Sequence, residues 1–145
     1  WDIHTEGTQP AVRAVTDRLD AERIAIREAL GYGAPHYPLA DHYTSDRWMY
    51  GDAHRKLQKS GDWREHIDLI HHRYVSEDIE LGLSLLASVA RWAAVDAPIA
   101  HGLLALAGGW LGRDLRAGPR SLDALGLARL SRTAFTEGLA EGRLP

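Results

Sequence analysis

Several kinds of residue and pattern are missing from this 145-residue sequence, and each absence narrows its function. No cysteine is present, which excludes disulfides, thiolate metal sites and thiol catalysis. The formal net charge is −3 and no basic run occurs, so nucleic acid is not an expected partner. Glu80 and Arg91 interrupt the most hydrophobic segment, so no membrane span is expected. No signal peptide is visible, and a cytoplasmic location is the expectation.

Familiar catalytic motifs are also absent. No Gly-x-Ser-x-Gly elbow occurs for a nucleophilic serine. Gly108-Gly109 falls in a predicted helix and does not follow a strand, so it forms no phosphate-binding loop. The eight histidines include no pair four residues apart around a glutamate, as a metallopeptidase helix requires. We expect the histidines to be solvated or hydrogen-bonded.

The chain begins at Trp1, and its only methionine is Met49. Because translation starts with methionine, we expect the sequence to come from a longer or a processed protein. Its length and its 45% hydrophobic content suffice for one domain with a core of its own. Residues 1–145 are therefore predicted to form a single domain.

Apolar residues recur at spacings of three, four and seven between residues 10 and 30, which predicts a long amphipathic helix. Thr8 is its candidate N-cap, Pro10 suits the first turn, and Gly31 ends it. Further helices are predicted near residues 46–59, 79–95, 98–111 and 121–125, with a last one after Ser131, and short turns are predicted at residues 39–43 and 62–72. No strand alternation occurs, so the predicted fold class is all-α.

Four of the five tyrosines lie between Tyr32 and Tyr50. Aromatic side chains with polar tips line many ligand clefts, but they also cover the rims of small cores. Both interpretations stay open. Tyr43, Trp48 and Trp63 are equal candidates for stacking on a substrate.

One polar stretch, residues 73–83, leads into the most hydrophobic run. Arg73 offers a planar fork of donors that suits a carboxylate or a phosphate. Asp78 follows five residues later, where the start of an apolar helix would keep it ionised and let it orient a histidine. The alternative is structural: Glu77 and Asp78 would cap the helix, with a salt bridge from Arg73 beside them.

Four segments, in the same order, resemble the α-helical domain of the octopine/nopaline (opine) dehydrogenase family. They are Glu6-Gly7-Thr8-Gln9-Pro10 with the helix behind it, Arg73 to Asp78 with Gly82-Leu83, Ala94-Val95-Asp96-Ala97-Pro98, and Arg120 to Leu127. The last segment is similar to the family's carboxy-terminal Gly-Arg-Thr-Leu type signature, with Pro119 where glycine is common. The resemblance implies a helical bundle like the carboxy-terminal domain of opine dehydrogenases, which is itself similar to that of 6-phosphogluconate dehydrogenase.

Enzymes of this family join an amino acid to a 2-oxo acid and reduce the resulting imine with NADH or NADPH. The resemblance implies that this chain is the substrate-binding and dimerisation domain of such an oxidoreductase. It also implies an upstream Rossmann domain that binds most of the cofactor. The implied partners are the amino acid, the 2-oxo acid, the upstream domain and a second copy of the chain.

Motif by motif, Arg73 falls on the family's arginine that holds the oxo-acid carboxylate. Asp78 falls on the aspartate that pairs with the catalytic histidine. That histidine lies upstream of the Glu6 segment in the family, and His4 stands where an aromatic residue is usual. The resemblance thus implies that Asp78 is catalytic, that Arg73 binds substrate, and that the chain holds no metal ligand or main cofactor site. The isolated chain should then be inactive.

Two other functions stay open. A stand-alone helical interaction module without catalysis would bind another subunit through an apolar face. A histidine–metal protein would use a group such as His66, His71 and His72, the three closest in the sequence.

Overall fold

The structure, a computed structural model, describes Gly7 and residues 9–43, 55–56, 59–60, 66 and 68–144. Within these ranges every regular element is a helix and none is a strand, which confirms the all-α class. The elements in chain order are α1 (Pro10–Ala29), α2 (Leu39–Tyr43), η1 (Tyr74–Leu83), α4 (Ser84–Ala93), α5 (Pro98–Leu111), η2 (Leu115–Ala117) and α6 (Arg132–Glu141). None of the helices in the described ranges is long and apolar enough to cross a membrane.

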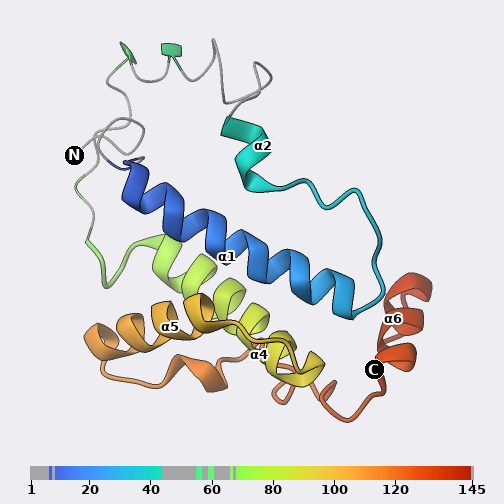
Figure 1. Cartoon of the computed structure of the whole chain (residues 1–145). Coiled ribbons are helices and arrows are strands. Elements are labelled where there is room, and N and C mark those ends of the chain that lie inside the picture. The colour runs from blue at the N-terminus through green and yellow to red at the C-terminus, as the bar shows by residue number, and fades with distance from the viewer. Residues whose placement is uncertain are drawn as a thin grey trace.

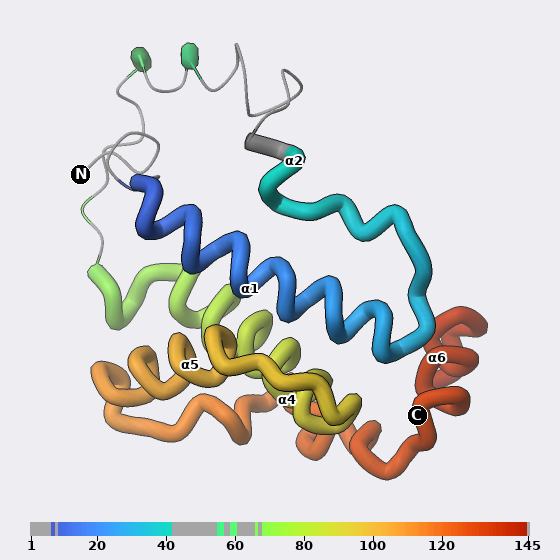
Figure 2. Tube along the Cα trace, in the orientation of Figure 1, coloured from blue at the N-terminus to red at the C-terminus, as the bar shows by residue number. Residues whose placement is uncertain are grey.

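Three helices form the body of the domain. α1 packs against both α4 and α5, which are antiparallel neighbours joined by residues 94–97 (Figure 1). α6 lies beside the carboxy-terminal end of α1 (Figure 1). The trace in Figure 2 shows that η1 runs straight into α4, so the two form one continuous rod.

Small side chains dominate the core between these helices. Because alanine leaves only a methyl group at the interface, the backbones of α4 and α5 can approach closely, and larger residues there would force them apart. The buried members of this cluster are Ile26, Leu83, Ala87, Ala90, Ala97, Ala100, Leu104, Ala107 and Leu115.

The joint between α1 and α5 contains a buried carboxylate. Ala97, the N-cap of α5, has no side chain that could cap the helix. Glu22 of α1 does so instead: its two oxygens accept hydrogen bonds from the backbone N–H groups of Ile99 (2.7 Å) and Ala100 (2.9 Å). Glu22 is only 8% exposed. A carboxylate at a helix start satisfies unpaired N–H groups and interacts favourably with the helix dipole.

The last helix, α6, provides a side chain that caps the carboxy-terminal ends of α1 and α4. The Arg132 guanidinium donates to the carbonyl oxygens of Ala29, at the end of α1, and Ala93, at the end of α4. Phe135 packs on Trp92 with 5.1 Å between the ring centroids. A cation at helix carboxy-termini satisfies carbonyl groups that have no partner in their own helix.

Most of the predicted helix ends are confirmed. Gly31 follows α1 with a φ of 86°, and Gly112 ends α5 with a φ of 66°. The Ser131 side chain caps α6 by accepting from the N–H of Ala134.

Other predicted helix limits are wrong or lie outside the described residues. Gln9, not Thr8, is the N-cap of α1, since Pro10 already occupies the first helical position. Residues 121–125 form hydrogen-bonded turns that end at Gly126 (φ 72°), not a helix. The predicted helix at 46–59 falls mostly outside the described residues. Of the turn predicted at 62–72, the described end does contain a turn, at residues 69–71.

Candidate functional site

The stretch that carries Arg73 and Asp78 folds as a π-helix. η1 begins at Tyr74, not at residue 79 as the sequence pattern predicted, and continues for 10 residues before α4 begins at Ser84. At this junction the backbone N–H of Ser84 still donates to the carbonyl oxygen of Ile79, five residues back. π-helices are rare, usually only a single turn long, and frequent at functional sites. The length of this one marks the stretch as unusual.

The π register places Arg73 and Asp78 on one face. An i→i+5 hydrogen bond sets residue i+5 roughly one turn above residue i. Arg73, with helical φ and ψ of −55° and −33°, immediately precedes η1, and Asp78 is five positions further on. In an α-helix, with about 3.6 residues per turn, the two side chains would point about 140° apart. The π-helix therefore aligns two residues that an α-helix would separate.

The sequence predicted Asp78 at the start of a helix, and this prediction is wrong. Four residues of η1 precede it, so its carboxylate is beyond the first turn, where a helix N-terminus stabilises negative charge best. Glu77 is the acidic residue of that first turn. Of the structural alternative, only the salt bridge is missing: neither Arg73 nor Asp78 forms an ion pair within the described part of the chain, whereas Glu77 does lie in the first turn.

Both side chains are exposed, and the arginine is held by stacking. The guanidinium carbon of Arg73 lies 5.4 Å from the ring centroid of Tyr74, and that ring lies 4.7 Å from the ring of His72. Stacking on a ring restrains a guanidinium and leaves its N–H donors available. Arg73 can therefore donate a bidentate pair to a carboxylate, while Asp78 can accept from an imidazole or an ammonium group.

A second polar pair lies just before this face, and the sequence analysis missed it. His71 Nδ1 is 2.8 Å from Asp68 Oδ2, and the hydrogen bond with His71 is the main cause that lowers the pKa of the Asp68 carboxyl. The Asp-x-x-His spacing was a visible signal for such a local pair. Both side chains are exposed, at 58% for Asp68 and 79% for His71, so solvent surrounds the imidazole. We therefore assign this pair no role in the site.

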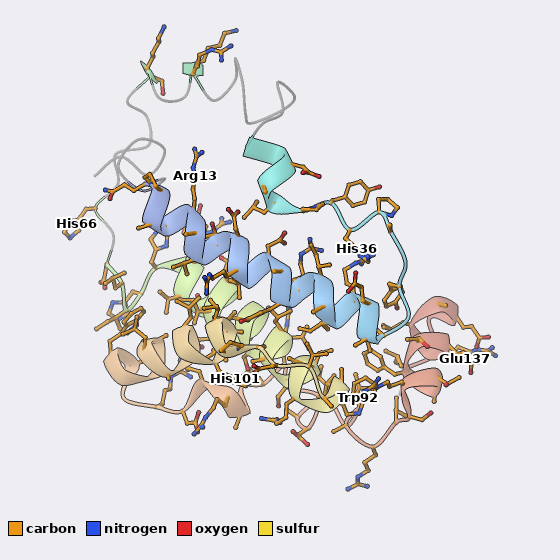
Figure 3. The ribbon with its side chains drawn as sticks, viewed as in Figure 1. Arg13, His36, His66, Trp92, His101 and Glu137 are labelled. Carbon is orange, nitrogen blue, oxygen red and sulfur yellow. The ribbon has the colours of Figure 1, made fainter. Side chains whose placement is uncertain are left out.

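The described histidines do not gather at one place. His36, His66 and His101 lie in three separate regions of the molecule (Figure 3). His36 lies beside α1, with its Nε2 atom 3.5 Å from Glu28 Oε1. In the ranges that the structure describes, no group of three or more His, Asp or Glu residues could hold a metal ion.

Two shallow recesses flank the segment 113–117. One has a volume of about 310 Å³ and the other about 320 Å³. In the first recess, the Arg116 guanidinium donates hydrogen bonds of 2.7 to 3.2 Å to the Asp114 carboxylate and lowers the pKa of that carboxyl to about 2. In the same recess, Arg91 Nη2 lies 3.2 Å from Asp123 Oδ2. Because its charges are paired with each other, this recess presents no net charge to a ligand. Arg73 and Asp78 line neither recess.

The aromatic residues of the first half are only partly described. Tyr32 and Tyr37 are 37% and 69% exposed on the loop after α1. Arg23 fastens this loop by donating to the carbonyl oxygens of His36 (2.9 Å) and Tyr37 (3.3 Å). Tyr43, Trp48 and Trp63, the candidates for substrate stacking, have side chains outside the described part of the structure.

Comparison with known proteins decides the family. The family described as "NAD/NADP octopine/nopaline dehydrogenase, alpha-helical domain" matches residues 1–111, a range that includes α1, η1, α4 and α5. The chain belongs to this family. The match confirms the resemblance drawn from the sequence motifs, and by its description the family depends on NAD or NADP. The signature-like segment at 120–127 lies beyond the matched residues.

One relative is the opine dehydrogenase of Arthrobacter sp. (strain 1C). It is 29% identical over 137 residues, which are 90% of this chain and 37% of the relative. The chain thus spans little more than a third of the length of the curated relative that it matches.

Proposed function

We propose that this chain is the substrate-binding helical domain of an NAD(P)-dependent opine-type dehydrogenase, which condenses an amino acid reductively with a 2-oxo acid. The observation that carries the proposal is the π-helical register of η1, which begins directly after Arg73 and from which we infer that Arg73 and Asp78, five residues apart, share a face. A guanidinium and a carboxylate with no ion pair to each other form a site for a substrate that carries both an anionic group and a basic one.

Each residue has a distinct role in this proposal. The exposed Arg73 fork binds the carboxylate of the oxo acid, which fixes the position of the carbon to be reduced. Asp78 accepts a hydrogen bond from an imidazole supplied by another part of the complete protein, which sets the tautomer and orientation of that imidazole. Arg73 is thus a substrate-binding residue, and Asp78 a catalytic one that acts with the histidine.

The nicotinamide cofactor belongs mainly to another domain in this proposal. Dinucleotides are typically held where a strand runs into a helix through a glycine-rich turn. The described ranges contain no strand, so their residues do not fit that role. We therefore expect an upstream Rossmann domain to bind NAD or NADP and this domain to close over the substrate, with a second copy of the chain as a further partner.

Two substitutions in the complete protein test the assigned roles. Arg73→Ala should raise the KM for the oxo acid about 10–100-fold with a smaller change in kcat, since one charged hydrogen-bond pair is lost. Asp78→Asn should lower kcat about 10²–10⁴-fold, because the imidazole loses the group that orients it. Steady-state kinetics with pyruvate, a panel of amino acids and NADH or NADPH would measure both.

Arg129→Ala and Asp96→Asn are the matched controls, since both residues are exposed and have no recorded partner in the described structure. Both controls should keep the kinetics of the parent protein. Parent-like kinetics in the Arg73 and Asp78 variants as well would rule out the proposed site.

One observation favours the alternative of a non-catalytic interaction module. On α5, Leu106 is 61% exposed and Trp110 is 38% exposed, so this helix presents apolar surface to solvent. Such surface is typical of a face that another domain or subunit covers. A complete protein that turns over no amino acid and oxo acid, yet associates stably through this face, would favour the module.

A further inference from the structure

The π-helix η1 is held at its carboxy-terminal end by a distant segment of the chain. A π-helix is rarely stable for more than a turn, so ten residues of it require support from their surroundings. η1 packs against α4 and α5, and residues 113–118, which follow α5, contact the last turn of η1 and the first residue of α4. Two of these contacts involve Glu80, inside η1.

The first contact is an ion pair. The Arg113 guanidinium donates to the Glu80 carboxylate. The Glu80 side chain is 17% exposed and that of Arg113 is 56% exposed, so the carboxylate is largely buried while the guanidinium reaches it from the surface. Partial burial strengthens the attraction, since less water screens the charges. This pair ties the last turn of η1 to the segment that follows α5.

The second contact is steric, and only glycine permits it. A methyl group at position 118 would lie 2.5 Å from Ser84 Oγ and 3.0 Å from the carbonyl oxygen of Glu80. Gly118 has a φ of −61°, which any residue adopts, so the constraint is space and not backbone conformation. The chain at Gly118 therefore presses directly on the junction where the π register of η1 changes to the α register of α4.

We propose that Arg113 and Gly118 are positioning residues that maintain the π register of η1, and through it the common face of Arg73 and Asp78. This inference rests on the proposed function, because the shared face matters only if both side chains contact the substrate complex. If the junction moved and η1 relaxed to an α-helix, the side chains of Arg73 and Asp78 would point about 140° apart. Arg113 and Gly118 would then influence turnover without touching the substrate.

The test is Gly118→Ala in the complete protein, assayed at a temperature where circular dichroism shows it to be folded. The added methyl group crowds both Ser84 Oγ and the Glu80 carbonyl oxygen, and we expect the junction to shift in response. KM for the oxo acid should then rise and kcat should fall together, by about 10-fold or more in kcat/KM. Gly102→Ala is the matched control, because a methyl group there meets nothing within 4 Å, and it should keep parent kinetics.

A double-mutant cycle separates positioning from a general loss of structure. If Gly118→Ala acts through the alignment, it should add little to the loss already caused by Arg73→Ala plus Asp78→Asn. Ser84→Ala removes the atom nearest to the new methyl group and should restore part of the activity. Should Gly118→Ala fail to fold, Arg113→Met tests the other contact by the same cycle, with Arg129→Met as its control.

The outcomes distinguish this inference from the proposed function. Parent kinetics in folded Gly118→Ala and Arg113→Met, with the expected losses in the Arg73 and Asp78 variants, would overturn the inference alone. Full additivity in the cycle would also overturn it, because the effect would then not pass through those two side chains. Parent kinetics in the Arg73 and Asp78 variants would instead overturn the proposed function.

Discussion

At the scale of single residues, Ser84 and Ser88 lie one turn apart on α4 and are 0% and 2% exposed, yet their hydroxyl groups differ. Ser88 Oγ accepts a hydrogen bond from the backbone N–H of Leu122 (2.9 Å). Ser84 Oγ has no hydrogen-bond partner. A buried polar group without a partner costs folding free energy, whereas a paired one costs little.

These two serines should therefore respond to the same substitution with opposite signs. Ser84→Ala should raise the free energy of unfolding by roughly 1 kcal/mol, because an unpaired hydroxyl is removed. Ser88→Ala should lower it by about 1–3 kcal/mol, since the buried N–H of Leu122 loses its acceptor. Urea denaturation of both variants beside the parent would measure the two changes. Equal losses in both would mean that Ser84 Oγ is paired in solution.

Residue types could be read from the sequence at the candidate site, but the environments of those residues could not. The donor fork of Arg73 and the carboxylate of Asp78 are properties of the side chains themselves, so spacing and family motifs were enough to select them. The stacking of Arg73 on Tyr74 left no clear pattern in the sequence. Their assigned roles stay predictions until the kinetics are measured.

At the scale of elements, one carboxylate decides how α1 and α5 meet. Glu22 caps α5 through Ile99 and Ala100, in the place where most helices use a residue of their own. Nothing local in the sequence singled out Glu22, since it looks like one more charged residue on an amphipathic helix. The cap exists only because the two helices cross there.

Removing this cap should destabilise the domain. Glu22→Ala should lower the free energy of unfolding by about 1–3 kcal/mol, because two N–H groups at the buried start of α5 lose their acceptor. Glu22→Gln keeps one acceptor oxygen and should cost less. Glu137→Ala, on the exposed side of α6, is the control and should stay within about 0.5 kcal/mol of the parent. Thermal and urea unfolding would measure all three, and an unchanged Glu22→Ala would contradict the capping role.

The register of η1 is the element-scale feature that the sequence pattern did not reveal. Its apolar residues predicted a helix from residue 79, but the helical structure begins four residues before Asp78. Apolar spacing shows that a segment is helical, and over a few residues it barely separates α from π. The choice between them depends on what packs at the far end of the segment, here the residues around Gly118.

At the scale of the whole molecule, we expect catalysis to need more than this domain. Residues 1–145 produced alone should oxidise no NADH or NADPH with pyruvate and any amino acid, because the described part contains no strand–helix unit to hold a dinucleotide. The complete protein should do so. A spectrophotometric assay of NADH and NADPH oxidation, with the isolated chain and the complete protein at equal concentration, would test this. Turnover by the isolated chain would contradict the proposal that the cofactor is bound by another domain.

The sequence by itself determined the features that depend on neighbours a few residues apart. Apolar periodicity, Pro10, Gly31, Gly112 and Ser131 located helices and most of their ends, because propensity and capping act within one or two turns. Short segments such as Glu6–Pro10 and Arg73–Asp78 were likewise enough to indicate the family, which the match over residues 1–111 confirms.

Tertiary structure decided the features that join residues far apart in the chain. The cap that Glu22 provides to α5 spans 77 and 78 positions, and the Arg113–Glu80 pair spans 33. The close approach of Gly118 to Ser84 is another contact between residues far apart in the chain. Contacts at such separations form only when helices pack, so no local pattern encodes them. The alignment of Arg73 with Asp78 depends on the π register of η1. The residues that contact the end of η1, Arg113 and Gly118, lie about 30 positions further along the chain and reach it only through packing.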